Sequence, residues 1–244
     1  MLLVALATLI SNAQSAPAAR VPVVVELFTS EGCSSCPPAD DVLRALARQQ
    51  PVSGVQVIPL GMHVTYWDDQ GWKDPASLVL ATERQQEYSR AFGPGRMYTP
   101  QAVIDGREEL VGSDEDGLRR AIARAAGQPH AHLAVTSSIA GDALLVNVTV
   151  NDVPAEIKEP LETRLVVTED DLTSVVKRGE NGGRTLHHDA VVRLLFGGDV
   201  GAARALTYRA SLKPAWRRDR LHLSALLQGK KTLRIWGAAT AALK

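Results

Sequence analysis

Cysteine is scarce in this sequence, and neither sign of charge is in excess. Only two of the 244 residues are cysteines, so at most one disulfide can form within the chain. Lys plus Arg and Asp plus Glu number 27 each, which leaves no basic field to hold nucleic acid or an anionic membrane surface. Hydrophobic residues make up 45% and charged residues 22%. This composition is typical of a globular protein, and the length suffices for two domains of average size.

The N-terminus has the features of a secretory leader. An apolar run at residues 2–10 is followed by small and polar residues at 11–16, as in the apolar and cleavage regions of a signal peptide. The run is too short to span a bilayer, and no Lys or Arg follows Met1. We expect residues 1–19 to be a leader that directs the chain to the periplasm or outside the cell; a disordered cytosolic tail is the alternative. An oxidising compartment would allow a disulfide to persist.

The two cysteines are close together, at Cys33 and Cys36, after an apolar run at 21–28 and before an expected helix. Unsatisfied backbone N–H groups at a helix start favour the thiolate form of a nearby cysteine. A disulfide across so short a loop gains little stability, so redox exchange is a better interpretation than an inert bridge. We expect Cys33 to be the exposed nucleophile at the helix start and Cys36, one turn deeper, to be the resolving thiol. Metal binding and an inert bridge stay open.

Hydrophobic periodicity predicts an ordered set of elements after the cysteines. The N-terminal half shows strand, helix, strand, helix, hairpin and helix, at residues 21–28, 40–48, 55–60, 74–92, 98–111 and 114–126. From Gln128 onward the sequence pattern changes to short segments in which polar and apolar residues alternate, with glycine-containing turns between them. That sequence pattern is typical of an all-β sandwich.

The first half of this order resembles the thioredoxin fold, with Cys-X-X-Cys after the first strand and Thr99-Pro100 before the hairpin. Four segments, at 26–40, 63–68, 71–75 and 98–101, resemble a bacterial exported family catalogued only as domain of unknown function 1223. The resemblance implies that Pro100 is cis and lies beside the disulfide, next to a substrate-binding edge at Thr99. A trans proline that opens a strand is the alternative.

The fold class expected from these patterns is an α/β thioredoxin-like domain followed by an all-β sandwich. We place the first domain at residues 21–127 and the second at 129–244. The second domain has no cysteine, so any function of its own would be binding or positioning.

Glu26 is the only acid in the first strand. The resemblance implies that a buried carboxylate near this place moves protons for Cys36. A shift of one residue would reverse the face to which Glu26 points, and it could then be paired elsewhere. Glu31, two residues before Cys33, is expected to be an exposed loop acid.

Four residues after the second strand could form the rim of a substrate groove: His63, Tyr66, Trp67 and Trp72. They could equally pack the loop that contains them onto the sheet. His187, His188 and Asp189 could bind a metal, but they are weak evidence for a metal site, because consecutive strand residues point to opposite faces and the two imidazoles rarely converge.

The function favoured by the sequence is an exported thiol–disulfide oxidoreductase that acts on protein or small-thiol disulfides and needs no cofactor. The rivals are a copper- or zinc-binding protein that uses Cys33, Cys36 and His63, and a binding module without catalysis.

Overall fold

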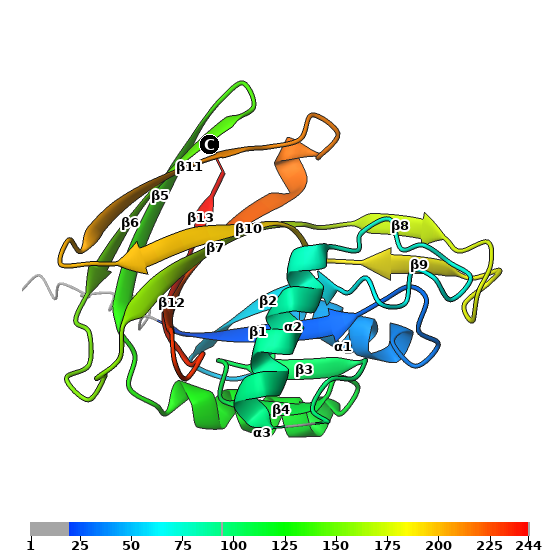
Figure 1. Ribbon diagram of the computed structural model, residues 1–244, viewed down its shortest axis with the longest axis horizontal. Coiled ribbons are helices and arrows are strands. Elements are labelled where there is room, and N and C mark those ends of the chain that lie inside the picture. Colours follow the sequence, from blue (N-terminus) through cyan, green and yellow to red (C-terminus); the bar gives the residue numbers. More distant parts are fainter. Residues whose placement is uncertain (1–19, 94, 244) are drawn as a thin grey trace, which may run out of the picture.

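The computed structural model describes residues 20–93 and 95–243 (Figure 1). The leader expected at residues 1–19 lies outside the described residues. Within the described part, none of the helices combines the length and apolar character needed to cross a membrane.

The first half of the chain has the expected order of elements. It contains β1 (Val21–Thr29), α1 (Pro37–Gln49), β2 (Val55–His63), α2 (Val79–Phe92), β3 (Gln101–Ile104), β4 (Glu108–Val111) and α3 (Glu115–Ala126). Strand β1 pairs in parallel with β2 and antiparallel with β3. Helix α2 begins at Val79, five residues after the start of the range predicted at 74–92, and the side chain of Asp74 instead accepts the amide of Ala76 in a separate turn.

The second half of the chain is built from strands. These are β5 (His132–Ala140), β6 (Ala143–Asn151), β7 (Leu161–Glu169), β8 (Leu172–Val175), β9 (Thr185–His188), β10 (Val191–Val200), β11 (Ala205–Ser211), β12 (Leu221–Gly229) and β13 (Ile235–Ala242). A 3-10 turn at Arg218–Arg220 precedes β12.

The expected fold class, an α/β thioredoxin-like domain followed by an all-β sandwich, is wrong. Four strands of the second half extend the sheet of the first half into one mixed eight-stranded sheet, in the order β13-β12-β7-β10-β2-β1-β3-β4. The halves join where Val191 of β10 pairs in parallel with Gly61 of β2, and the amide of Gly61 donates to the carbonyl of Ala190 at 2.8 Å. Alternation within a strand shows which of its faces is buried, but not which strand lies beside it. The division of the chain near residue 128 into separately folding units stays a prediction.

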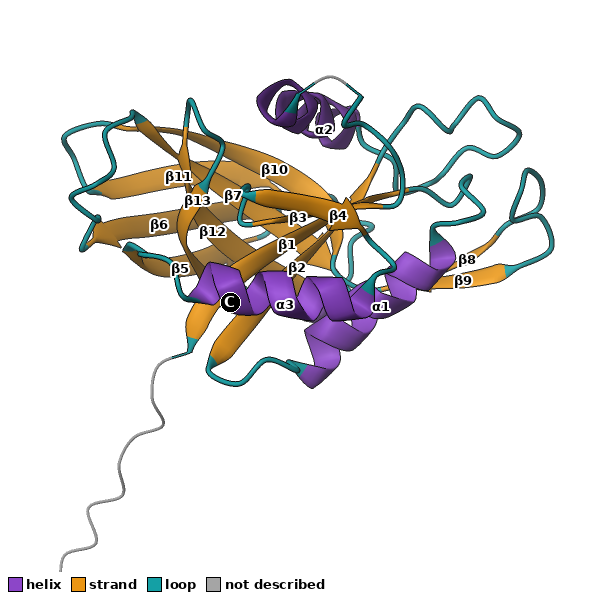
Figure 2. Ribbon diagram, turned by 90° about the horizontal axis from the view of Figure 1, so that it is seen from below, coloured by secondary structure: helices purple, strands orange, loops and turns teal. Residues whose placement is uncertain are grey.

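Helices cover both faces of the first half of the sheet (Figure 2). Because successive residues of β1 point to opposite faces, one set packs beneath α1 and α3 and the other beneath α2. The first set is Val23, Val25 and Leu27, and the second is Val24 and Phe28. A separate three-stranded sheet, β11-β6-β5, packs on the second half of the large sheet through an apolar core. The sheet thus holds the C-terminal ends of β1 and β2 side by side.

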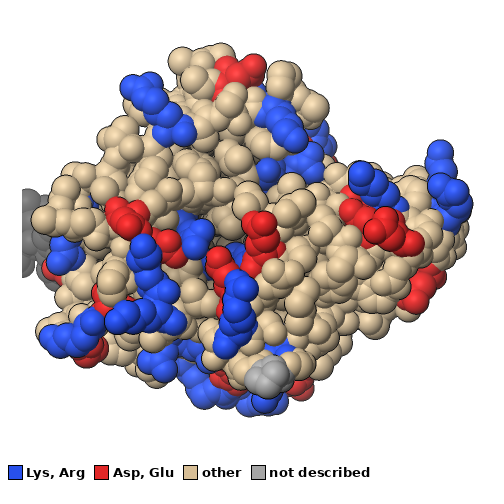
Figure 3. Space-filling model, in the orientation of Figure 1, with Lys and Arg blue, Asp and Glu red and all other residues tan. Residues whose placement is uncertain are grey.

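Strands β8 and β9 form a two-stranded hairpin that leaves the large sheet (Figure 1). The hairpin extends over the start of α1, at the end of the molecule where β1 and β2 finish. On the face shown in Figure 3, Lys and Arg side chains are interspersed with Asp and Glu, as the balanced composition suggests.

Candidate functional site

A disulfide between Cys33 and Cys36 closes the turn between β1 and α1, which confirms the expected pairing. Cys36 is the N-cap residue of α1, and its carbonyl accepts the amides of Ala39 and Asp40 at 2.8 and 3.1 Å. Prolines follow at the first two helical positions, where no N–H donor is needed. The pair therefore lies at the positive end of the helix dipole, a position that favours a thiolate.

The hairpin β8–β9 covers the disulfide. Cys33 and Cys36 are 1% and 0% exposed, although Ser34 and Ser35 between them are exposed. The expectation of an exposed Cys33 is therefore wrong, because the distant hairpin packs over the cysteine turn. The side chain of Asn181, itself 1% exposed, donates to the carbonyls of Glu31 and Cys33, both at 2.9 Å.

A second contact with the hairpin lies between the two cysteines. The carboxylate of Glu180 accepts the backbone amide of Ser34 at 2.9 Å. Hydrogen bonding from Ser34 lowers the pKa of Glu180. A segment almost 150 residues further along the chain thus closes over the cysteine turn.

Trp67 and Thr99 lie together beside the same turn. The indole N–H of Trp67 donates to Oγ1 of Thr99 at 2.8 Å. Trp67 also lies against Gly32, where an added Cβ would be 3.2 Å from Cβ of the tryptophan. The Thr99–Pro100 bond is cis, as expected, and the carbonyl of Pro100 accepts the amide of Gly112 at 2.9 Å.

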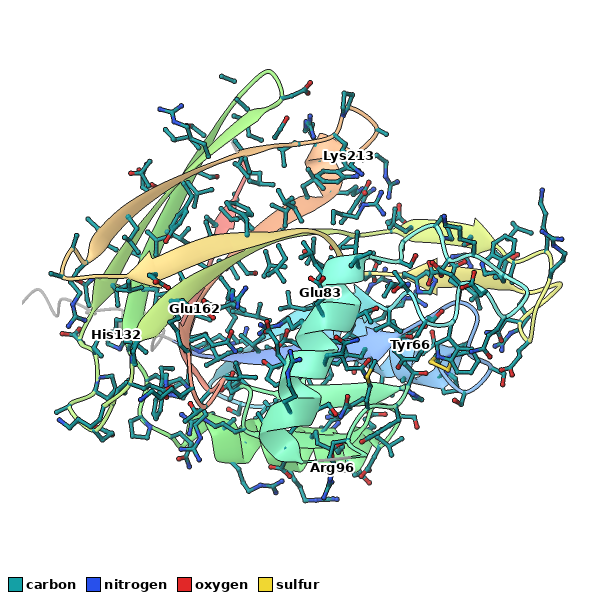
Figure 4. The ribbon with its side chains drawn as sticks, in the orientation of Figure 1. Tyr66, Glu83, Arg96, His132, Glu162 and Lys213 are labelled. Carbon is teal, nitrogen blue, oxygen red and sulfur yellow. A yellow bond between two sulfur atoms is a disulfide. The ribbon has the colours of Figure 1, made fainter. Side chains whose placement is uncertain are left out.

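Tyr66 lies at the same end of the molecule as the disulfide (Figure 4), with its hydroxyl donating to the side chain of Gln85 at 3.1 Å. It packs against the core beneath α2 and is half-buried. This contact fits the packing interpretation of Tyr66 better than a place on an open rim.

A buried polar cluster lies next to the disulfide, and it combines residues from the β1–α1 turn, α1, β2, the β2–α2 loop and β9. We call it the buried acid–histidine cluster; its members are Glu31, Asp40, His63, Asp74 and His188. The rings of His63 and His188 meet edge to face, with centroids 4.9 Å apart. Nδ1 of His63 is 2.7 Å from Oδ2 of Asp74, and the same oxygen accepts the amide of Glu31 at 2.9 Å.

Glu31 is 1% exposed, so the expectation of an exposed loop acid is wrong. Its Oε2 accepts the indole N–H of Trp72 at 2.7 Å and the hydroxyl of Ser174 at 2.9 Å. Its Oε1 lies 3.4 Å from Nε2 of His188. These partners hold the carboxylate within the cluster.

His63 and Asp74 form a buried ion pair at neutral pH. Burial opposes the charge of His63, but the charge and hydrogen bond of Asp74 outweigh it and raise the pKa of His63 from 6.5 to about 9. Burial also opposes the charge of Asp74, and His63 outweighs it and lowers the pKa of Asp74 to about 2. His63 is 2% exposed, so it supports the site from beneath instead of forming a substrate rim.

This ion pair gives a testable pH dependence of stability. The pKa of His63 is raised from 6.5 to about 9 in the folded protein. Protonated His63 therefore contributes fully to the free energy of unfolding below pH 6.5, and this contribution is lost as the pH rises through 9. We expect the free energy of unfolding to fall by on the order of 2–3 kcal/mol over this interval. Urea unfolding at each pH measures this fall.

The comparison variant is His63→Gln, which should lack this fall. His132→Gln, at an exposed histidine (Figure 4), should retain it. The same fall in His63→Gln as in the unchanged protein would show that another group causes it.

Glu26 does not face the cysteines. It forms an ion pair with Arg84 of α2 on the other side of the sheet, and Nη2 of Arg84 donates to Oε2 of Glu26 at 2.9 Å. The hydroxyl of Tyr88 also donates to this carboxylate. Of the two interpretations that the sequence allowed for Glu26, the structure supports the paired one.

Sequence reasoning missed four members of the site. Asp40 and Asp74 stand at the first positions of the ranges predicted at 40–48 and 74–92, with no predicted role in the site. The contacts of Glu180 and Asn181 depend on the distant hairpin, which no local pattern predicts. The two histidines of β9 point to opposite faces, as expected for consecutive strand residues: His188 is buried and His187 is exposed. Within residues 20–93 and 95–243, no three His, Cys, Asp or Glu side chains converge in a geometry that could hold a metal ion.

Comparison with known proteins identifies the family. A family described as protein of unknown function DUF1223 matches residues 24–228. The solved structure of protein AGR_C_4864 from Agrobacterium tumefaciens is similar, with 29% sequence identity, a TM-score of 0.67, and coverage of 91% of this chain and 94% of that chain.

HBP35 of Porphyromonas gingivalis shares the fold at 16% identity and a TM-score of 0.67, with coverage of 92% of this chain and 76% of that chain. No curated protein matches the chain. Since the family match spans most of the chain, including the cysteine turn and the hairpin that covers it, the protein belongs to the DUF1223 family.

Proposed function

We propose that this protein is a thiol–disulfide oxidoreductase that exchanges disulfides with proteins or small thiols through Cys33 and Cys36. The observation that carries this proposal is the disulfide at the N-terminal end of α1, with Cys36 as the N-cap residue. A bridge between residues three positions apart does little for stability, whereas the helix end favours the thiolate that exchange requires.

In the exchange step, a thiolate of the partner attacks Sγ of Cys33, the Cys33–Cys36 bond breaks, and Cys36 leaves as a thiolate. Attack by a second thiol of the partner on the mixed disulfide releases the partner as a disulfide and leaves both cysteines reduced. The reverse sequence reduces a partner disulfide. Electrons pass only between sulfur atoms, so the step needs no cofactor.

The proposal includes export to the periplasm or the outside of the cell. Disulfides persist in these oxidising compartments, and the apolar run near the N-terminus supports export.

The direct test is exchange in a glutathione redox buffer, with oxidation of a fluorescent dithiol peptide as the readout. We expect the protein to accelerate peptide oxidation at substoichiometric concentration, and a variant with both cysteines replaced by serine to give only the background rate. Equal rates for the two proteins would contradict the proposal.

The hairpin must yield before a partner reaches Cys33, because Asn181 and Glu180 hold the cysteine turn closed. Asn181→Ala removes two buried hydrogen bonds, each worth about 1 kcal/mol. We therefore expect the disulfide of this variant to react with dithiothreitol about tenfold faster. Release of the two thiols, followed by quenched alkylation and mass spectrometry, measures the rate.

The matched control is Asn147→Ala, at an exposed asparagine of β6 in the three-stranded sheet, which is separate from the β8–β9 hairpin. It should react at the rate of the unchanged protein. An unchanged rate in Asn181→Ala would show that the hairpin does not limit access.

A further inference from the structure

Asp40 is the member of the buried acid–histidine cluster that lies on the same helix as the cysteines. The amide of Asp40 donates to the carbonyl of Cys36 at 3.1 Å, so the two residues are one helical turn apart. Side chains at positions i and i+4 of a helix lie next to each other on one face. The carboxyl group of Asp40 therefore lies on the face of α1 that begins at Cys36.

The surroundings of Asp40 leave it without a full counter-charge. Its Oδ1 accepts the hydroxyl of Thr29 at 2.8 Å, but its Oδ2 is 3.7 Å from Nδ1 of His188, beyond hydrogen-bond distance. Asp40 is 7% exposed, and burial raises the pKa of its carboxyl group. Glu26 and Asp74, by contrast, are each neutralised by a close cationic partner.

His188 gives independent support, because it is 4% exposed and its Nε2 has no hydrogen-bond partner. The charged and titratable groups around Asp40 come from every element that packs there: His188 of β9, His63 of β2, Asp74 of the following loop, and Glu31 across the ring of His188. A carboxyl group in these surroundings can gain or lose a proton without breaking a strong ion pair.

We propose that Asp40 exchanges a proton with Cys36 during thiol–disulfide exchange, with Thr29 and His188 as positioning residues. This inference rests on the proposed function. It names the group that carries the proton, a role that the sequence suggested for Glu26.

The proton and the electrons balance at each step. When a partner thiolate attacks Cys33 and the disulfide breaks, Cys36 leaves as a thiolate and takes the proton of protonated Asp40. In the reverse direction, the carboxylate of Asp40 accepts the proton of the Cys36 thiol, and the resulting thiolate attacks Sγ of Cys33. The mixed disulfide then breaks and the partner leaves as a thiolate.

The test uses the reduced full chain and 5,5′-dithiobis(2-nitrobenzoate), whose released thiolate is coloured. Cys33 releases one equivalent as it forms a mixed disulfide, and attack by Cys36 releases the second equivalent. Stopped-flow measurement of the second release between pH 5 and 9 reports the proton step on Cys36. The variants are Asp40→Asn and, as the control, Asp41→Asn, whose carboxyl group is 72% exposed on the same helix.

For Asp40→Asn we expect the second release to slow by about a hundredfold near pH 6.5 and to rise about tenfold per pH unit, because the proton must now leave without a carboxylate acceptor. Asp41→Asn should follow the unchanged protein. Identical profiles for the two variants would overturn the proton role of Asp40.

Thr29→Val gives a second reading, since it keeps the carboxyl group and removes the hydroxyl that stabilises its charged form. We expect the acidic limb of the profile to shift upward by about one pH unit. An acidic limb at the same pH as in the unchanged protein would contradict the role of Thr29 in positioning Asp40. Absence of any second release from the unchanged protein would instead contradict the proposed function, whatever the role of Asp40.

Discussion

Cys36→Ser should trap mixed disulfides through Cys33. In this variant the Cys33 thiolate can still attack a partner disulfide, but no neighbouring thiol remains to displace the partner. Intramolecular attack by a positioned group is strongly favoured over attack by a second molecule, so we expect the mixed disulfide to last at least about a hundredfold longer than in the unchanged protein. Incubation with glutathione disulfide, acid quenching and intact-mass measurement detects the adduct.

The control for this trap is Cys33→Ser. This variant lacks the thiol assigned as nucleophile and keeps only Cys36, the N-cap residue of α1, so it should accumulate little adduct over the same interval. Equal trapping by the two variants would contradict the assignment of Cys33 as nucleophile. Absence of trapping by either would contradict the exchange function itself.

Glu26→Gln should destabilise the protein without slowing exchange. Glu26 and Arg84 have 1% and 3% exposed side chains, and Arg84 also donates to Gln228 of β12 at 3.1 Å. Removal of one partner leaves the other charge buried and uncompensated, which costs about 3–5 kcal/mol of unfolding free energy. Chemical denaturation measures this loss, and the peptide-oxidation assay at low temperature measures exchange.

A matched control exists on the same helix: Glu83→Gln, at an exposed position of α2 (Figure 4), should change stability by less than about 0.5 kcal/mol. The double variant Glu26→Gln/Arg84→Met should recover part of the stability, because it removes both buried charges. Loss of exchange in a folded Glu26→Gln protein would restore the proton role that the sequence allowed for Glu26.

The cysteine turn could be predicted because its signals are local. An apolar strand, two cysteines and the prolines at the first turn of α1 follow one another within 20 residues, and each element needs only its neighbours. The Cys33–Cys36 pairing and a helix after it are therefore predictable from the sequence, although α1 begins at Pro37, three residues before the range predicted at 40–48.

The rest of the site depends on contacts that no local pattern contains. Asn181 reaches the carbonyl of Cys33 across 148 positions, through a hairpin whose sequence specifies a turn but not its destination. The fold class could not be predicted for the same reason. The carbonyl of Ala190 lies close to Gly61, where an added Cβ would be 3.3 Å from the carbonyl oxygen, and a glycine in a strand does not indicate which strand will approach it.

The central claim, that the Cys33–Cys36 disulfide exchanges with partners, is tested most directly by its reduction potential. Equilibration of the full chain with mixtures of reduced and oxidised glutathione, followed by alkylation and mass measurement, gives this value. We expect a potential between about −120 and −270 mV, the range of disulfides that exchange in function. A potential below about −300 mV would identify a structural disulfide and contradict the account.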